Sequence, residues 1–567
     1  MKYKVGSKNK GSQFIDVELS FSTIGKKQTV LQLPTWRPGR YELGNFAKNI
    51  RAFQVFDAQN KAVPFQKTST HTWVIESKKS QPLRVVYQYY ANELNAGSTW
   101  VDGKQLYINP VNCLMYIEGM QNEPCELSFD VPRNYIIATA LSKNKQNIFT
   151  AKNFDELADS PAICSATIKH GCYKVQGVDF HVWFQGECQP TWEKLIADFS
   201  KFTEKQLETM SSFPFKSYHF LFQIVPYQAY HGVEHSNSTV ILLGPSYDVM
   251  NLTFYEELLG VSSHELFHAW NVKSIRPADM LPYDFTKENY TELGYLTEGV
   301  TTYLGDLFLS KSNIFNEERY VKELHKLLDR HSLNYGRFNY SVCESSFDTW
   351  LDGYSKGIPN RKGSIYTEGA LLALCIDLLL INNSKATINL GKVMQVLFKD
   401  YALKEIGITE EIIIKTIEDL GGSTIQSIFT NYYHQAVDYF ALLKSSLKWV
   451  GLNLNKQVNE NFLAGKLGCY TDTLGKVLSI APNSPADQNN ILLNDEIIAV
   501  NGNRTTNNCI NWCNYFKDEL TLTFKNEFGT KSIQLTPLKE DYFEKYRITP
   551  VEKPSAKQKL NKEFWLG

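Results

Sequence analysis

Two histidines separated by three residues, with a glutamate directly after the first, form the most informative pattern in the chain. They lie in the run His264-Glu265-Leu266-Phe267-His268. Because successive helical residues turn by about 100°, His264 and His268 lie one turn apart on one face and can bind the same metal ion. Glu265 projects beside that face, where a carboxylate can take a proton from an activated water. The spacing predicts a zinc-hydrolase site on a helix.

A catalytic zinc ion generally has three protein ligands and one open position, so a third residue must complete the site. Glu298 is the candidate, because it lies in a second apolar-periodic segment, residues 295–303, that can pack against the first helix. Pro277 and Pro282 lie between the segments and are expected to break the first helix. Thr302, one turn after Glu298, is expected to support a ligand by a hydrogen bond. We therefore expect one Zn²⁺ ion held by the two histidines and this glutamate.

Length and charge limit the classes of protein that fit. At 567 residues the chain is too long for one core, and about three or four domains are expected. A net charge of -1 gives no argument for nucleic acid as a partner. Ten cysteines without CxxC spacing favour reduced core thiols.

The sequence contains no segment that predicts membrane insertion. The longest apolar run, near Ala370 to Ile381, is interrupted by Asp377 and suits a buried helix better than a membrane span. Residues 1–21 lack the apolar stretch of a signal peptide, so we expect a cytoplasmic protein, with an exported form left open.

The distribution of apolar residues predicts a multidomain α+β fold. Residues 1–168 contain short alternating runs such as Leu83 to Tyr89, which favour an N-terminal antiparallel β-sandwich. Residues 169–445 should form a mostly α-helical catalytic domain, with helices expected at Trp192 to Met210, Glu292 to Leu309 and Thr367 to Ile381.

Short β-like runs return after residue 445. Lys476 to Ile480 and Glu496 to Val500 indicate a small β-rich domain, placed at residues 446–545. Residues 546–567 are expected to form a loosely held C-terminal tail, because the stretch from Glu552 to Lys562 is charged and lacks apolar periodicity.

Several motifs resemble one family. The run from His264 to Pro277, HELFHAWNVKSIRP, resembles the signature of the glycyl aminopeptidase family of zinc metallopeptidases. Residues 298–303, EGVTTY, resemble that family's third-ligand segment, and residues 33–41, LPTWRPGRY, resemble its Trp-x-Pro-Gly-x-Tyr turn. The resemblance implies a thermolysin-like catalytic domain of the glutamate-ligand, or gluzincin, type.

The resemblance also implies a substrate-binding segment. Residues 232–239, GVEHSNST, are similar to the family's Gly-Leu-Glu-His-x-Asn-Ser-Thr segment, in a region where related aminopeptidases bind the free α-amine with a glutamate. An anionic carboxylate suits an ammonium group. Glu234 is therefore the expected specificity residue, and His235 beside it is a second substrate-binding candidate.

A tyrosine is expected to assist catalysis. Residues 364–372, SIYTEGALL, resemble the Tyr-x-Lys-Gly segment that carries an oxyanion-stabilising tyrosine in related aminopeptidases. This gives Tyr366 that role by resemblance, although Glu368 replaces the lysine. Tyr303 and Tyr354 are reserve candidates.

The last domain resembles the PDZ module at the carboxyl end of this family. Residues 477–486 and 494–502 carry the best match, while Asn489-Asn490-Ile491 replaces the usual Ala-Gly-Leu and Asn494 replaces a glycine. Residues 465–468 form either a carboxylate-binding loop or a plain turn. A peptide ligand of this PDZ-like domain is therefore a possible partner beside the peptide substrates.

Together these patterns predict a zinc-dependent aminopeptidase that removes N-terminal residues from peptides, and the family resemblance implies small residues such as glycine or alanine. Two alternatives remain open at this point. One is a zinc endopeptidase, and the other is a PDZ-based peptide-binding protein with a vestigial zinc site.

Overall fold

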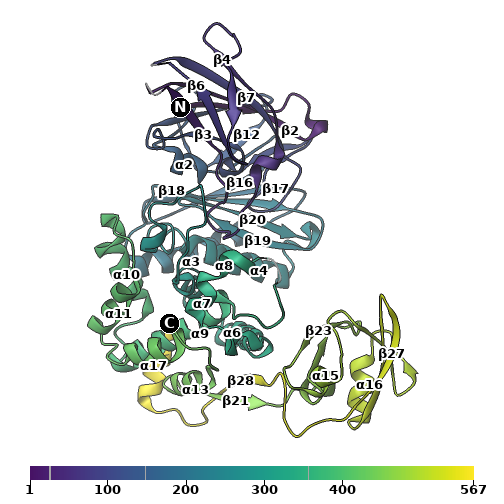
Figure 1. Cartoon of the computed structure of the whole chain (residues 1–567). Coiled ribbons are helices and arrows are strands. Elements are labelled where there is room, and N and C mark those ends of the chain that lie inside the picture. Colours follow the sequence, from purple (N-terminus) through teal and green to yellow (C-terminus); the bar gives the residue numbers. More distant parts are fainter. Residues whose placement is uncertain (25–26, 79, 147, 355–356) are drawn as a thin grey trace.

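The computed structural model describes residues 1–24, 27–78, 80–146, 148–354 and 357–567. Figure 1 shows a β-rich N-terminal region at the top, a central sheet beneath it, a large group of helices below that sheet, and a small C-terminal lobe at one side. The molecule is therefore a multidomain α+β protein with a sheet-rich N-terminal region and a helical middle region, as the sequence predicts.

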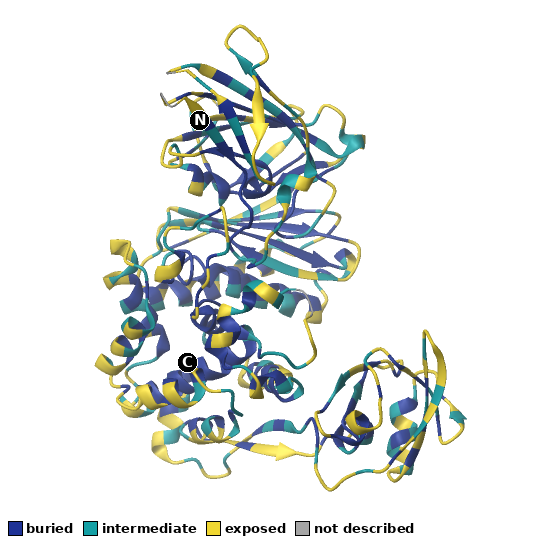
Figure 2. Ribbon diagram, in the orientation of Figure 1, coloured by how far each residue is buried: buried dark blue, intermediate teal, exposed yellow. Residues whose placement is uncertain are grey.

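Three sheets form the N-terminal region, and they enclose a core of their own (Figure 2). The largest has the order β13 (Ser142–Lys143), β14 (Phe149–Ala151), β11 (Cys125–Asp130), β1 (Lys2–Gly6), β2 (Phe14–Ser22), β7 (Pro82–Tyr90), β4 (Ile50–Asp57). The second has the order β10 (Tyr116–Ile117), β3 (Gln28–Gln32), β6 (Thr72–Glu76), β5 (Phe65–Lys67). The third has the order β12 (Ile136–Thr139), β15 (Ala162–Ser165), β9 (Gln105–Ile108), β8 (Trp100–Val101), and the short helices are η1 (Lys10–Ser12), η2 (Phe46–Asn49), α1 (Pro110–Cys113) and α2 (Phe154–Ala158).

The expectation that these strands are all antiparallel needs one correction. Strand β7 alternates between buried and partly exposed residues, as the run from Leu83 to Tyr89 predicts. Strands β1 and β11, however, pair in parallel. A parallel pair needs a long connection, and here most of the N-terminal region lies between the two strands. Alternation along single strands carries no information about such a pairing.

The middle region begins with a five-stranded sheet that the sequence patterns do not predict. Its order is β16 (Lys169–Val175), β17 (Val178–Gln185), β18 (Ser217–Ile224), β20 (Ser238–Gly244), β19 (Ala229–Glu234). Strands β18 and β20 are almost continuously buried, so they lack the alternation that marks a half-exposed strand.

Helices cover this sheet and build the rest of the middle region. The longer ones are α3 (Trp192–Met210), α4 (Leu252–Phe267), α5 (Thr301–Lys311), α6 (Glu317–Leu333), α9 (Ile365–Asn383), α10 (Leu390–Asp400), α11 (Glu410–Asp419) and α13 (Phe440–Lys448). The short ones are η3 (Ser246–Asp248), η4 (Ala278–Met280), η6 (Tyr335–Phe338), α7 (Val342–Phe347), α8 (Thr349–Asp352), η7 (Ala402–Lys404) and α12 (Ile425–Ile428), and two π-helical segments are η5 (Tyr295–Val300) and η8 (Phe429–Tyr433).

The expected long helices are present. Helix α3 has the bounds that the periodicity predicts, and α9 is slightly longer than expected. Helix α9 is the one described helix that is long and apolar enough to cross a membrane, but almost all of it is buried inside the protein. It is packed as a core helix.

A two-stranded ribbon, β21 (Leu452–Gln457) paired with β28 (Lys545–Pro550), leads to the C-terminal lobe. The lobe contains α14 (Phe462–Gly465), β22 (Cys469–Thr471), β23 (Val477–Ile480), α15 (Pro485–Gln488), β24 (Glu496–Val500), β25 (Asn503–Arg504), α16 (Cys509–Phe516), β26 (Leu520–Asn526) and β27 (Gly529–Leu535). It has a separate apolar core, and a smaller apolar cluster packs its residues Ala464 and Ala481 with Tyr335 of the helical region.

The expectation of a loosely held tail at 546–567 is wrong. After β28, residues Ala556–Leu566 form α17, which Ser555 caps through a capping box. Trp565 is 1% exposed, and its indole nitrogen donates to the hydroxyl of Tyr303 at 2.8 Å. The charged stretch shows no apolar period because the apolar residues that pack against the core, Phe564, Trp565 and Leu566, lie beyond Lys562.

Candidate active site

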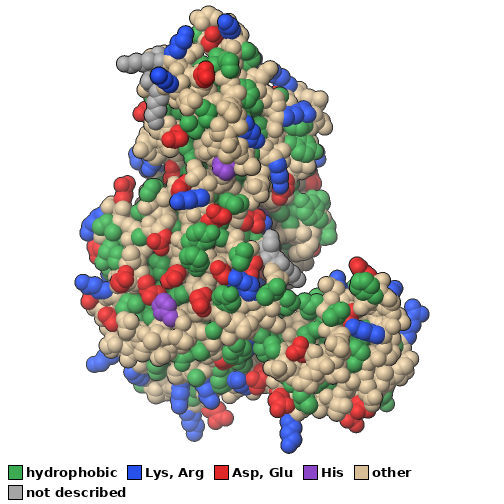
Figure 3. Space-filling model, in the orientation of Figure 1, with side chains coloured by type: hydrophobic (Ala, Val, Ile, Leu, Met, Phe, Trp, Pro, Cys, Tyr) green, Lys and Arg blue, Asp and Glu red, His purple; other side chains and the backbone are tan. Residues whose placement is uncertain are grey.

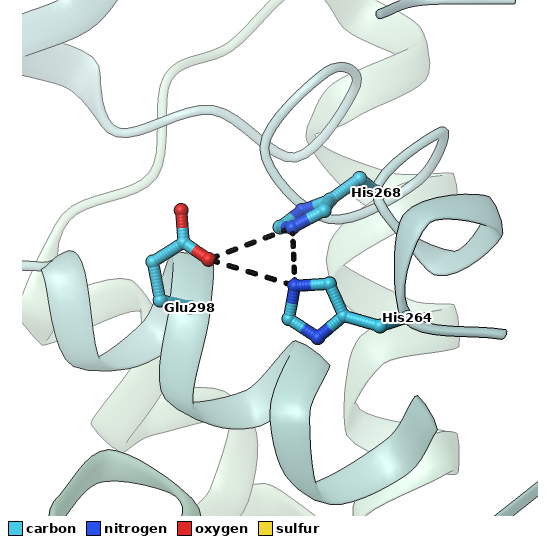
Figure 4. A group of neighbouring side chains, drawn as sticks. All are labelled: His264, His268 and Glu298. Carbon is cyan, nitrogen blue, oxygen red and sulfur yellow. Dashed lines mark hydrogen bonds and ion pairs between the residues drawn. The ribbon is translucent and has the colours of Figure 1, made fainter. Parts of the chain in front are cut away.

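Helix α4 brings the two histidines of the motif to one point. The ring nitrogens His264 Nε2 and His268 Nε2 are 3.0 Å apart, and Glu298 Oε2 lies 3.8 Å and 3.5 Å from them (Figure 4). His268 and Glu298 are buried, while His264 keeps 20% of its side chain exposed. The three atoms form a small triangle that is open toward solvent on the His264 side.

Close packing of the backbone beside Glu298 holds its side chain near the two histidines. It lies in the π-helical segment η5, a form that often occurs at functional sites. A Cβ atom placed on Gly299 would lie 2.4 Å from the Cα of Gly369, so only glycine lets η5 and α9 cross this closely. The crossing fixes Glu298 near the start of α9, where Tyr366 lies.

A strained turn after α4 orients His268. Its Nδ1 lies 2.9 Å from the carbonyl oxygen of Asn271, which fixes the ring with Nε2 toward Glu298. Val272 has φ +88°, a left-handed conformation that is rare for a β-branched residue. Helix α4 therefore ends at its C-cap residue His268, where this turn begins. The sequence predicts a later end, at Pro277.

The Asn271 side chain joins this turn to η5. Its Nδ2 donates to the carbonyl of Leu296 at 2.7 Å and to Thr301 Oγ1 at 3.0 Å. Thr302 was expected to support a ligand, but no described hydrogen bond involves its side chain; Thr301 is the residue that makes this contact. The difference is one residue along the helix, which turns the hydroxyl away from the site.

Two more carboxylates lie beside the triangle. Ligand atoms of Glu234, Glu265 and His268 all lie within 4.8 Å of one another. Thr239 Oγ1 lies 3.3 Å from Glu265 Oε2, and a Cβ on Gly232 would lie 2.1 Å from Glu265 Oε1, so a side chain at position 232 would displace this carboxylate. Burial and the neighbouring acids raise the pKa of Glu265 to about 8, although His268 lowers it.

The donor set and its charge fit a divalent metal ion. Three buried carboxylates and two imidazoles crowd one point, and buried charges are costly unless an opposite charge neutralises them. Burial lowers the pKa of His268, but Glu298 more than compensates and the pKa rises to about 10. Without a metal ion, a proton on His268 therefore supplies the positive charge that a bound cation would otherwise provide. His264, His268 and Glu298 provide the ligand atoms that a zinc-type ion prefers.

The N-terminal region forms part of the site wall. In the turn from Trp36 to Tyr41, Gly39 has φ +81°, and a Cβ there would lie 2.4 Å from Glu234 Oε2. Trp36 Nε1 donates to the carbonyl of Asp284 at 2.8 Å, and its ring packs edge-on against Trp350. The turn is therefore inserted into the middle region against Glu234.

Tyr366 and Tyr354 lie together near the metal-binding triangle. The pKa of Tyr366 is raised well above its ordinary value by burial, by Glu298 and by the neighbouring Tyr354, to which it hydrogen-bonds. The Tyr354 hydroxyl lies 3.4 Å from the carbonyl oxygen of Gly39. Both phenols therefore stay protonated and can donate hydrogen bonds. The other reserve candidate, Tyr303, points into the core, where it contacts Asp377 and Trp565.

His235 belongs to a buried polar cluster between the two regions. Its Nδ1 lies 3.1 Å from Asp159 Oδ1, and Lys273 Nζ lies 2.9 Å from the same oxygen. Ser236 donates to Asp159 from its backbone and its hydroxyl, at 2.8 and 2.6 Å. His235 Nε2 is buried and has no partner among the described residues, so its role as a substrate ligand stays a prediction.

The sequence motifs predict site residues that the fold places close together. They do not predict several residues whose hydrogen bonds and ion pairs hold the site in place. Asn271 and Lys273 lie inside the HELFHAWNVKSIRP run, so the motif itself contains both positions. Asp159 carried none, because a single aspartate in the N-terminal region has no motif around it.

Two family models match the regions that build this site. Residues 2–166 match the Peptidase M61 N-terminal domain, and residues 257–372 match the M61 glycyl aminopeptidase domain. No curated protein matches the chain.

A solved structure shares the fold over the whole chain. An aminopeptidase N family protein from Idiomarina loihiensis is 26% identical and has a TM-score of 0.91, with 100% of both chains covered. An M1 zinc metallopeptidase from Deinococcus radiodurans, bound to a Tyr-Ser-Ala substrate, is 12% identical with a TM-score of 0.49, over 77% of this chain and 94% of its own. The chain thus carries both domains of the M61 glycyl aminopeptidase family, and these domains and the site they contain identify it as a metallo-aminopeptidase.

Proposed function

We propose that the protein removes residues one at a time from the free amino termini of peptides, with a zinc ion held by His264, His268 and Glu298. The observation that carries this proposal is the position of Glu234, whose carboxylate lies within 4.8 Å of ligand atoms of both Glu265 and His268. A carboxylate at that distance suits the ammonium group of the residue whose peptide bond is cleaved.

A bound zinc ion would polarise the peptide carbonyl and lower the pKa of a water toward about 7. Glu265 takes the proton of the attacking water and passes it to the leaving amine, a role that its raised pKa suits. Tyr366 stays protonated and donates a hydrogen bond to the oxyanion. Glu234 holds the α-amine and so sets which bond is cut.

The tight packing around Glu234 supports a preference for small first residues such as glycine or alanine. The Gly39 backbone lies directly against the Glu234 carboxylate, and the Tyr354 hydroxyl lies near the carbonyl of Gly39. The turn and the phenol lie beside the proposed amine site, where they would limit the room for a large side chain.

The free-amine requirement separates this proposal from an endopeptidase. We expect cleavage of a peptide that begins with a free glycine or alanine, and little cleavage of the same peptide after acetylation. Glu234→Gln should reduce kcat/KM for the free-amine peptide, because the amide cannot pair with the ammonium. Equal rates on the free and acetylated peptides would reject the aminopeptidase assignment.

The role of Glu265 is tested by Glu265→Gln. The amide cannot accept a proton, so kcat should fall by about 10²–10⁴-fold while the zinc content stays unchanged. Glu298→Ala is the matched comparison, since it should lower the zinc content measured by metal analysis. Retained turnover in Glu265→Gln would remove that residue from the mechanism.

We also propose that the C-terminal lobe is a PDZ-like module that binds peptide ends. Among the described residues β22 pairs only with β23, so its other edge is available for an added peptide strand. Residues 465–468 lie just before that edge, and Gly468 has φ +69°, which suits a tight carboxylate-binding loop. Binding of a peptide with a free carboxyl end, but not of its amide, supports this function; equal binding argues against it.

A further inference from the structure

A second group of metal-ligating side chains lies outside the catalytic site. Cys343 on α7, Glu410 at the start of α11 and His434 at the end of η8 each offer one ligand atom, and the three atoms lie within 4.8 Å of one another. Glu410 lies at the centre, with Oε1 2.8 Å from His434 Nε2 and Oε2 4.0 Å from Cys343 Sγ. Three segments far apart in sequence thus meet at one point.

The surroundings hold these groups in place and give access from one side. The capping box of Ser341 and Glu344 fixes the first turn of α7, and the Thr409 side chain caps α11. Cys343 is 3% exposed, whereas the His434 side chain is 40% exposed. The sulfur therefore lies at the floor of the cluster, and the imidazole lies at its solvent edge, where an ion can enter.

The electrostatics around the sulfur favour a cation. Burial raises the pKa of the Cys343 thiol, and the nearby carboxylates of Glu410, Glu292 and Glu344 raise it further. A hydrogen bond accounts for the His434 and Glu410 pair, but the thiol has only a carboxylate at the outer limit of a sulfur hydrogen bond. A metal ion would replace the thiol proton and satisfy the sulfur, the imidazole and the carboxylate together.

The donor set selects the kind of ion. Thiolate, imidazole and carboxylate are all zinc ligands, with metal–ligand distances of about 2.0–2.3 Å, which place tetrahedral ligands roughly 3.3–3.7 Å apart. The observed separations, 2.8 Å from His434 Nε2 to Glu410 Oε1 and 4.0 Å from Cys343 Sγ to Glu410 Oε2, lie on either side of that range, so side-chain rotations must bring one carboxylate oxygen between the imidazole and the thiol.

We propose that Cys343, Glu410 and His434 form a second metal site that binds a divalent ion of the zinc type, with water completing its coordination. Binding releases the thiol proton to solvent, and the proton between His434 Nε2 and Glu410 moves to Nδ1 or to solvent, so that two metal–ligand bonds replace the hydrogen bond between these side chains. Sulfur is a ligand at this site, whereas the catalytic triangle contains none.

The site is placed to stabilise the catalytic wall. The Tyr295 hydroxyl donates to Glu410 Oε2 at 3.3 Å, and the Tyr295 ring packs edge-on against Tyr433. Tyr295 lies in η5, about one turn before Glu298. An ion on Glu410 therefore joins α7, α11 and η8 around the segment that carries the third catalytic ligand, and its role is structural.

Cobalt substitution in the full-length protein tests the second site separately from the first. A His264→Ala, His268→Ala double variant removes the catalytic site, and in it we expect one Co²⁺ per chain with the near-ultraviolet absorption of a thiolate–cobalt bond. Adding Cys343→Ser or His434→Ala should remove both the absorption and the ion. His434→Ala guards against misfolding, because this side chain is partly exposed.

Cys375→Ala is the matched control, because Cys375 is also buried but is not one of the grouped ligands, so the cobalt absorption should remain. If the double variant binds no cobalt, or binds it without the thiolate absorption, the cluster is a hydrogen-bond network and the proposal is wrong. Neither result depends on peptidase activity.

Discussion

The N-terminal region and the C-terminal lobe are attached to the catalytic region in different ways. The N-terminal region inserts the turn at Gly39 against Glu234 and contributes Asp159 to a buried cluster with His235 and Lys273. The C-terminal lobe has its own core, is joined mainly by the β21–β28 ribbon, and stands out as a separate body in Figure 3. The N-terminal region is therefore part of the active site, and the lobe is an accessory module.

The ribbon still connects the lobe to the site through buried polar groups. Tyr546 in β28 donates to Asp438 Oδ2 at 2.7 Å, and that oxygen lies 3.9 Å from His331 Nε2. His331 Nδ1 lies 2.6 Å from Glu368 Oε2, two residues after Tyr366. A buried glutamate needs a partner, and His331 supplies it to Glu368.

The largest expected effect comes from breaking the buried cluster between the N-terminal and catalytic regions. Asp159→Asn leaves Lys273, whose side chain is 1% exposed, without its charge partner. We expect a loss of about 3–5 kcal/mol in the free energy of unfolding, together with reduced activity because His235 adjoins Glu234. Denaturant titration and kcat/KM measure the two effects.

Asp495→Asn is the control for that experiment. Asp495 is also buried and paired with a lysine, Lys531 Nζ at 2.7 Å, but both lie inside the C-terminal lobe. This variant should destabilise the lobe and leave kcat/KM unchanged. An equal loss of activity in both variants would contradict the contrast between the two attachments.

A smaller effect is expected from Gly39→Ala. A side chain in the left-handed conformation costs about 1–2 kcal/mol, and the new Cβ would also displace the Glu234 carboxylate. We expect kcat/KM for free-amine peptides to fall by roughly a hundredfold, or about 2.7 kcal/mol.

Gly502→Ala provides the matched comparison. Gly502 has φ +79°, and a Cβ added there would meet no described atom within 4 Å, so the substitution adds only backbone strain in the lobe. Its kcat/KM should equal that of the unmodified protein. Normal kinetics in Gly39→Ala would show that the turn does not position Glu234.

The smallest effect is expected from Tyr546→Phe, which removes the hydrogen bond from the ribbon to Asp438. Coupling through such a chain is typically about 0.5–2 kcal/mol, so we expect kcat to fall by about two- to thirtyfold. Tyr515→Phe, at an exposed position in the lobe, should change nothing. Full kcat in Tyr546→Phe would mean that the lobe is not coupled to Tyr366.

Much of the fold and of the candidate site follows from local patterns. Helix α3 and the alternation of β7 are visible in the spacing of apolar residues, because each pattern depends only on which face of one element is buried. The HExxH spacing places His264 and His268 on one helical face for the same reason. The central sheet could not be predicted from alternating apolar and polar residues, because β18 and β20 are buried on both faces.

The sequence by itself determined the chemistry: two imidazoles and Glu265 on one helix, with Glu298, Glu234 and Tyr366 assigned by motif. Tertiary structure decided which of these groups meet. The Gly299–Gly369 crossing sets the distance between Glu298 and α9, and the Gly39 turn brings the N-terminal region to Glu234. Such contacts join residues far apart in the chain, and they depend on packing between elements that no local spacing encodes.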